Sequence, residues 1–176
     1  MRLPADVTLI VVGAQDAIAP PLGAGGGRSG KANLASLIAV WRKEGLPIVQ
    51  AGLDSASSAS FKASAATLSD GETAIAADAA GAFFKTELGS LLEDAGVTTL
   101  VLCGALSAVE QTAREAENLG YRVFVPLDAC WPAVSPADAA IARLSREGAA
   151  VVDMATTLSA AAAAKARQRR DAERKR

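Results

Sequence analysis

The side chains that could do chemistry in this chain are few, and their types exclude several mechanisms. The sequence of 176 residues contains two cysteines, Cys103 and Cys130, and no histidine. Without an imidazole there can be no Ser-His-Asp triad, no Cys-His dyad and no histidine ligand for zinc. Two widely separated cysteines form neither a metal-binding motif nor a disulfide framework. We therefore predict no metal, no cofactor and a reducing, cytoplasmic environment.

Each candidate nucleophile lacks a group that would activate it. Cys103 closes the apolar run TTLVLC, and a thiol buried among apolar groups has a raised pKa and is inert. Cys130 is interpreted in the same way, as a packing residue. Ser107 follows the expected end of a strand, where ligands usually bind. Without a histidine or an identified lysine, however, its hydroxyl has no activating base.

The charged groups that could support a site are also scarce. Of the two lysines considered, Lys62 and Lys85, Lys85 opens a predicted helix and is interpreted as a surface lysine. Gln15 and Asp16 are expected to form turn hydrogen bonds, although Asp16 is the best remaining carboxylate. Residues 25–32 approach the phosphate-loop pattern GxxxxGK[ST], but Ala32 replaces the required hydroxyl. Because this segment also lies well beyond the first strand, a flexible surface loop is favoured.

The overall composition is that of one domain with balanced charge. There are 18 basic and 19 acidic side chains, so no global electrostatic feature favours a nucleic-acid or membrane partner. No apolar run is long enough for a transmembrane helix, and the first residues lack the pattern of a signal peptide.

Short apolar runs alternate with helical patterns along most of the chain. We predict a doubly wound, three-layer α/β/α sandwich with a mainly parallel sheet of about six strands. Any site should then lie at the carboxyl ends of the strands. The expected strands cover residues 7–12, 47–50, 73–76, 98–103, 121–125 and 149–153, and the expected helices lie near residues 31–44, 88–95, 109–116 and 136–147.

The last eighteen residues differ in character from the rest. We divide the chain into an α/β domain at 1–158 and an alanine-rich, basic helix or tail at 159–176. The alanine face of this helix is expected to pack on a partner while its cations meet carboxylates. The predicted interaction residues of the tail are Lys165, Arg167, Arg169, Arg170, Arg174, Lys175 and Arg176.

Five short segments carry a family resemblance through their order and spacing. They are LIVVGAQD at 9–16, FFKTEL at 83–88, GVTTLVLCG at 96–104, TAREAENLGYRV at 112–123 and the pair DA at 128–129. Over residues 7–155 the chain resembles the isochorismatase-like cysteine hydrolase superfamily, which includes nicotinamidases and other small amidases. The resemblance implies the same α/β/α fold and a tendency to form oligomers.

The resemblance also implies three catalytic positions, and none of them keeps its residue. The family uses a cysteine nucleophile, an aspartate that takes its proton and a lysine that supports the charge. Here the aspartate falls on Gly13, the lysine on Ala77 or Asp78, and the cysteine on Ala108 or in a two-residue deletion. We therefore predict no catalytic residue at these positions. The predicted vestigial pocket is formed by Gln15, Asp16, Phe83, Gly104, Ser107 and Ala108.

Three functions follow from this pattern. The favoured hypothesis is a non-catalytic structural, regulatory or assembly subunit, forming a homo-oligomer or a hetero-oligomer with another protein and not binding a membrane. The first alternative is an active hydrolase of a small amide, ester or vinyl ether with a relocated site that uses Asp16, Ser107 or Cys103. The second alternative is a nucleic-acid accessory protein that binds through the basic tail.

Overall fold

The computed structural model describes residues 3–4, 6–13, 27–52, 72–77, 81–131 and 137–174. Seven strands form one sheet in the order β3-β2-β1-β4-β5-β7, with β6 pairing on β4, and all the described pairs are parallel. The strand absent from the sequence prediction is β6, which is too short to produce a periodic pattern. The bounds are β1 Thr8–Val12, β2 Ile48–Gly52, β3 Glu72–Ala76, β4 Thr99–Ala105, β5 Arg122–Pro126, β6 Cys130–Trp131 and β7 Ala150–Val152.

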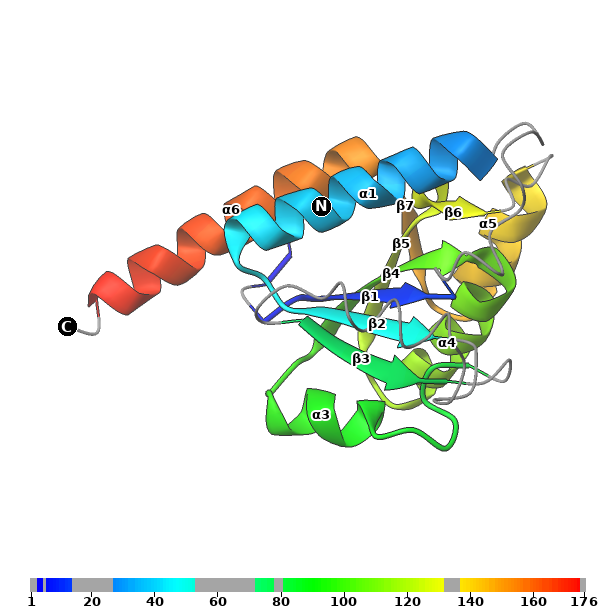
Figure 1. The fold of residues 1–176 in the computed structure, drawn as a ribbon, viewed down its shortest axis with the longest axis horizontal. Helices are drawn as coiled ribbons and strands as arrows, with labels where there is room; N and C mark the ends of the chain where they lie inside the picture. The colour runs from blue at the N-terminus through cyan, green and yellow to red at the C-terminus, as the bar shows by residue number, and fades with distance from the viewer. Residues whose placement is uncertain are drawn as a thin grey trace.

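Helices cover both faces of this sheet, which confirms the three-layer sandwich. Helices α1 and α6 run side by side over one face, and α3, α4 and α5 lie on the other (Figure 1). The bounds are α1 Gly27–Glu44, α3 Leu88–Asp94, α4 Leu106–Asn118, α5 Ala137–Arg146 and α6 Met154–Arg174, with a short 3-10 helix, η1, at Leu127–Ala129. None of the helices in the described ranges is long and apolar enough to cross a membrane.

The central strands β1 and β4 are buried along their whole length, as their continuous apolar sequences predict. Their close pairing depends on Gly104, which lies opposite Val12 in the register. Gly104 has a φ of 126°, and a Cβ atom there would overlap the carbonyl oxygen of Val12. Only glycine fits this position, so β4 can pair with β1 as far as Val12, and the next residue, Ala105, pairs with Trp131 on β6.

The glycine-rich segment before α1 is partly helical, so the interpretation of residues 25–32 as a surface loop is wrong from Gly27 onward. The reason lies in Gly30, where a Cβ atom would come within 2.6 Å of the carbonyl oxygen of Cys130. The missing side chain lets the first turns of α1 approach β6. Residues 27–32 belong to helix α1. They therefore do not form a loop whose N–H groups could surround a phosphate.

Helix α6 starts before residue 159 and is tied to the body of the protein. The Asp153 carboxylate accepts hydrogen bonds from the Thr156 N–H at 2.7 Å and from its hydroxyl at 2.8 Å. The Asp128 carboxylate accepts from the Met154 N–H at 2.9 Å. On the side of α6 toward α1, Ala161 and Ala164 are fully buried. The alanine face that was expected to hold a partner therefore packs on this chain instead.

Candidate active site at the carboxyl edge of the sheet

The positions that the family resemblance selects gather at the carboxyl edge of the sheet. The Gly13 N–H, just after β1, donates to the carbonyl of Ala51 at 2.9 Å. The Ala77 N–H, just after β3, donates to the carbonyl of Gly52 at 2.6 Å. Parallel pairing puts the end of β4 at the same edge, where α4 begins. The fold thus brings Gly13, Ala77 and the start of α4 to one edge.

The start of α4 carries the one exposed hydroxyl among these described positions. Strand β4 ends two residues later than predicted, and α4 follows it directly. Ser107 is exposed in the first turn of this helix, Ala108 is buried beside it, and Gly104 is buried in the preceding strand. The N-cap residue, Ala105, has no side chain that could bind the first N–H groups. The helix start therefore offers N–H donors and a positive potential next to a hydroxyl group.

Phe83 lies away from Ser107, although the sequence predicts both residues in one vestigial pocket. Its ring stacks on Tyr121, with centroids 5.8 Å apart, and its N–H donates to the Glu115 carboxylate at 3.2 Å. Both partners belong to the far end of α4 or beyond it, so the structure does not bring the Phe83 ring to Ser107. Gln15, Asp16, Lys62, Asp78, Lys175 and Arg176 lie outside the described residues.

Both cysteine thiols are buried and protonated near neutral pH, as the sequence indicates. Cys103 is fully buried, and its Sγ lies 3.8 Å from the carbonyl oxygen of Ile10. Burial raises the pKa of Cys103 well above its ordinary value. Burial also raises the pKa of Cys130 to about 12, and its Sγ lies 3.7 Å from the carbonyl oxygen of Pro126. Neither thiol can supply the thiolate that the family reaction uses.

Other charged groups near α4 are committed to structural contacts. Glu110, one turn after Ser107, forms an ion pair with Arg143 at 2.8 Å. Lys85 is exposed, and its ammonium lies over the Phe84 ring at 4.9 Å from the centroid, which confirms its surface position. Within the described ranges, no three His, Cys, Asp or Glu side chains gather as metal ligands.

The described part of the basic tail is only partly free. Arg167 donates a hydrogen bond to the carbonyl oxygen of Leu3, and Lys165 donates to the side chain of Gln168 at 2.8 Å. Arg169, Arg170 and Arg174 are exposed on the part of α6 that extends past the sheet (Figure 1). Two of the predicted interaction residues therefore bind within their own chain.

A sequence comparison establishes the family. A family profile described as the isochorismatase domain matches residues 7–156, and the chain belongs to this family. The fold agrees with this: an isochorismatase-family protein from Chromobacterium violaceum superposes with a TM-score of 0.77 at 28% identity, over 92% of this chain and 97% of that one.

Two further relatives carry the names of enzymes. Streptothricin hydrolase from Streptomyces noursei is 55% identical over 49 residues, which are 27% of this chain and only 18% of the relative. The chain thus spans less than a fifth of that relative in the matched region. N-carbamoylsarcosine amidase from Thermoplasma acidophilum shares the fold, with a TM-score of 0.66 at 21% identity over 88% of this chain and 97% of its own.

These relatives correct the main functional hypothesis. The prediction of a non-catalytic assembly subunit is wrong, because two relatives that share more than a quarter of their aligned residues with this chain are named as hydrolases. The prediction treated the loss of three aligned side chains as the loss of hydrolysis itself. The loss of those side chains bears on one mechanism of hydrolysis, not on hydrolysis as such. The assignment of the three positions to Gly13, Ala77 or Asp78, and Ala108 stays a prediction.

Proposed function

We propose that this chain is an active hydrolase of the isochorismatase family that cleaves a small amide or ester at the carboxyl edge of its sheet. The observation that carries the proposal is the start of α4, where exposed Ser107 lies beside N–H groups that the N-cap residue, Ala105, does not cap. The hydrolase and amidase names of the relatives support the reaction class. Vinyl ether cleavage is less favoured, because the resemblance implies that the family branch that performs it keeps the aspartate, and the predicted position of that aspartate here is Gly13.

The chemistry of the proposed site follows from the groups present. The first N–H groups of α4 can bind a substrate carbonyl oxygen and stabilise the negative charge that develops on it. The Ser107 hydroxyl, or a water held beside it, then attacks the carbonyl carbon and gives its proton to a base. The bond to the amine or alcohol breaks, and this group leaves with that proton. Where Ser107 is the nucleophile, a water then hydrolyses the acyl-serine ester, which releases the acid and restores the hydroxyl. Asp16 is the carboxylate that the sequence offers as the base. Cys103, the third candidate of the relocated site, is excluded by its burial and raised pKa.

A hydrolysis screen with point variants tests the proposal. The panel consists of nicotinamide, isochorismate, and simple aliphatic and aromatic amides and esters. We expect turnover of at least one amide or ester, reduced about 100-fold or more in Ser107→Ala and in Asp16→Ala. Cys103→Ala should keep the turnover number of the folded protein.

Ser90→Ala is the matched control, because Ser90 is an exposed serine on α3. Its turnover should equal that of the unaltered protein. Absence of turnover across the panel would contradict the proposed function, and equal rates in Ser107→Ala and Ser90→Ala would contradict the assignment of Ser107.

We also propose that the protein is a cytoplasmic oligomer, of itself or with another protein. The two unpaired, buried cysteines support a reducing compartment, and the exposed arginines at the end of α6 could contact acidic groups of another subunit. Sedimentation velocity of the purified chain is expected to show a species larger than 17.8 kDa. A single monomeric species at all concentrations would contradict self-association.

A further inference from the structure

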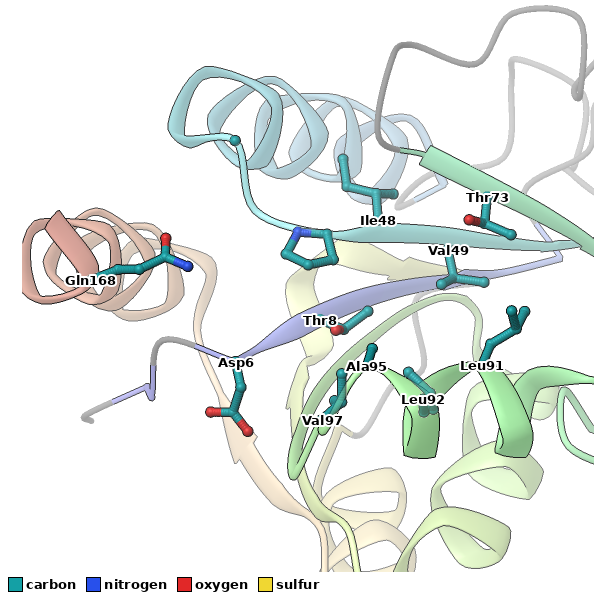
Figure 2. A pocket seen from close by; sticks show the side chains of 12 residues that line it. Asp6, Thr8, Ile48, Val49, Thr73, Leu91, Leu92, Ala95, Val97 and Gln168 are labelled. Carbon is teal, nitrogen blue, oxygen red and sulfur yellow. The ribbon is translucent and has the colours of Figure 1, made fainter. Parts of the chain in front are cut away.

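A cavity of about 480 Å³ lies at the amino edge of the sheet, opposite the edge that carries Ser107 (Figure 2). The strand registers place Thr8, Val49 and Thr73 on the same face of the sheet, and all three line the cavity. Helix α3 supplies the facing wall through Leu91 and other apolar groups. This volume and apolar lining are typical of small-molecule sites.

Thr8 gives this cavity a specific polar feature. The residue is only 1% exposed, and its hydroxyl has no hydrogen-bond partner within the described residues. A buried hydroxyl without a partner destabilises the fold, because it has lost its hydrogen bonds to water. Because Thr8 lines the cavity, a molecule bound there can supply the missing partner.

The mouth of the cavity carries balanced charges. Asp6 lines it, and its carboxylate is held by the Thr98 N–H at 2.9 Å and by the Thr98 hydroxyl at 2.7 Å. The ammonium of Lys165, on α6, donates at 2.8 Å to the Gln168 amide oxygen, and Gln168 is part of the lining. A carboxylate and an ammonium near one opening favour a ligand without net charge. Figure 2 shows the Gln168 side chain extending from α6 toward the lining residues on β1 and β2.

We propose that this amino-edge cavity is a second binding site, for a small, neutral, largely apolar molecule with a hydrogen-bonding group that pairs with Thr8. The apolar body of the ligand packs between Val49 on β2 and Leu91 and Leu92 on α3. The site is independent of the proposed hydrolytic reaction, because it lies at the other edge of the sheet.

Three probes of equal size test the chemical class: 2-naphthylmethanol, 2-naphthoate and 2-naphthylmethylamine. They share an apolar ring system and differ in charge, so their affinities separate shape from charge. We expect 2-naphthylmethanol to bind at least about tenfold tighter than either charged probe. Titrations followed by NMR should shift the backbone amides of Val49 and Leu92. Absence of binding up to the solubility limit, or equal binding of all three, would overturn the proposal.

Matched surface variants locate the binding site. Leu91 is 37% exposed at the cavity and Leu119 is 61% exposed at the end of α4, so an aspartate at either position should leave the protein folded. We expect Leu91→Asp to weaken 2-naphthylmethanol binding more than about tenfold and Leu119→Asp to leave it unchanged. The same affinity in both variants would place the probe elsewhere and overturn the site.

Thr8→Val tests the hydroxyl by two readouts, of which one needs no ligand. The change keeps the shape of the side chain and removes the unpaired group, so the urea midpoint of the free protein should rise. Binding of 2-naphthylmethanol should weaken about fivefold to tenfold, because one hydrogen bond is lost. A lower urea midpoint together with unchanged binding would show that the hydroxyl already has a partner, and would contradict its role.

Discussion

At the scale of single residues, Gly104 lies so close to the backbone of Val12 that no side chain fits between them. A Cβ atom at Gly104 would overlap the Val12 carbonyl oxygen, and its φ of 126° is unfavourable for any side chain. We expect Gly104→Ala to lower the free energy of unfolding by more than about 3 kcal/mol. Urea unfolding, or loss of soluble protein, measures this.

Gly96→Ala is the matched control for that prediction. Gly96 also has a positive φ, 64°, but nothing lies within 4 Å of the Cβ position. Gly96→Ala should lower the free energy of unfolding by only about 1 kcal/mol, which is the cost of the backbone conformation alone. Equal losses in the two variants would show that the contact with Val12 is unimportant.

Asp153 predicts a pH dependence of stability. The hydrogen bond from the Thr156 N–H, followed by that from the Thr156 hydroxyl, lowers the pKa of Asp153. A folded-state pKa below the unfolded value means that the carboxylate stabilises the fold above about pH 4 and loses this effect as pH falls through the folded pKa. Asp153→Ala should therefore lower the Tm at pH 7, and by less at pH 2. A Tm difference that is the same at both pH values would contradict the capping role.

At the scale of elements, the packing of α6 on α1 depends on small side chains. Ala161 is fully buried in this contact, whereas Ala162, the next residue, is exposed. Ala161→Leu should lower the free energy of unfolding by about 1–3 kcal/mol, because the larger side chain cannot be accommodated between the helices. Ala162→Leu should change it by less than about 0.5 kcal/mol. Chemical denaturation of both variants checks the pair.

Periodicity predicts the elements well where the pattern is strong and long. The runs that become β1 and β4, and the helical spacing of Leu34, Leu37 and Trp41 in α1, lead to the observed elements. The sequence does not predict strand β6, because its two residues are too few to show a period. It also does not predict the first turn of α1, because a glycine such as Gly30 normally indicates a loop. Its actual role, a close approach to Cys130, exists only in three dimensions.

The site is predicted less completely than the fold, for a physical reason. The sequence places Gly13, Ala77 and Ala108 at the carboxyl edge, since strand ends in a parallel sheet converge there. It also groups Phe83 with them, although the ring stacks on Tyr121. Side-chain direction is set by packing, which spacing does not contain. One sequence feature points to the amino edge: Thr8 is a polar residue at the start of an otherwise apolar buried strand.

At the scale of the whole molecule, the two sheet edges have different properties. The carboxyl edge combines the exposed hydroxyl of Ser107 with a helix start that Ala105 does not cap. The amino edge holds an apolar cavity lined by Thr8, whose hydroxyl has no partner in the described part of the chain. Both described thiols lie in the core. The central claim is therefore that this member of the isochorismatase family hydrolyses its substrate without a cysteine thiolate.

Iodoacetamide treatment of the active protein tests this claim most directly. At pH 8 the Cys130 thiol, with its pKa raised to about 12, and the fully buried Cys103 thiol should remain protonated and unreactive. We expect the hydrolysis rate on the best substrate of the screen to be unchanged after treatment, with no alkylated cysteine in the intact mass. Loss of activity in proportion to the alkylation of one cysteine would contradict the claim.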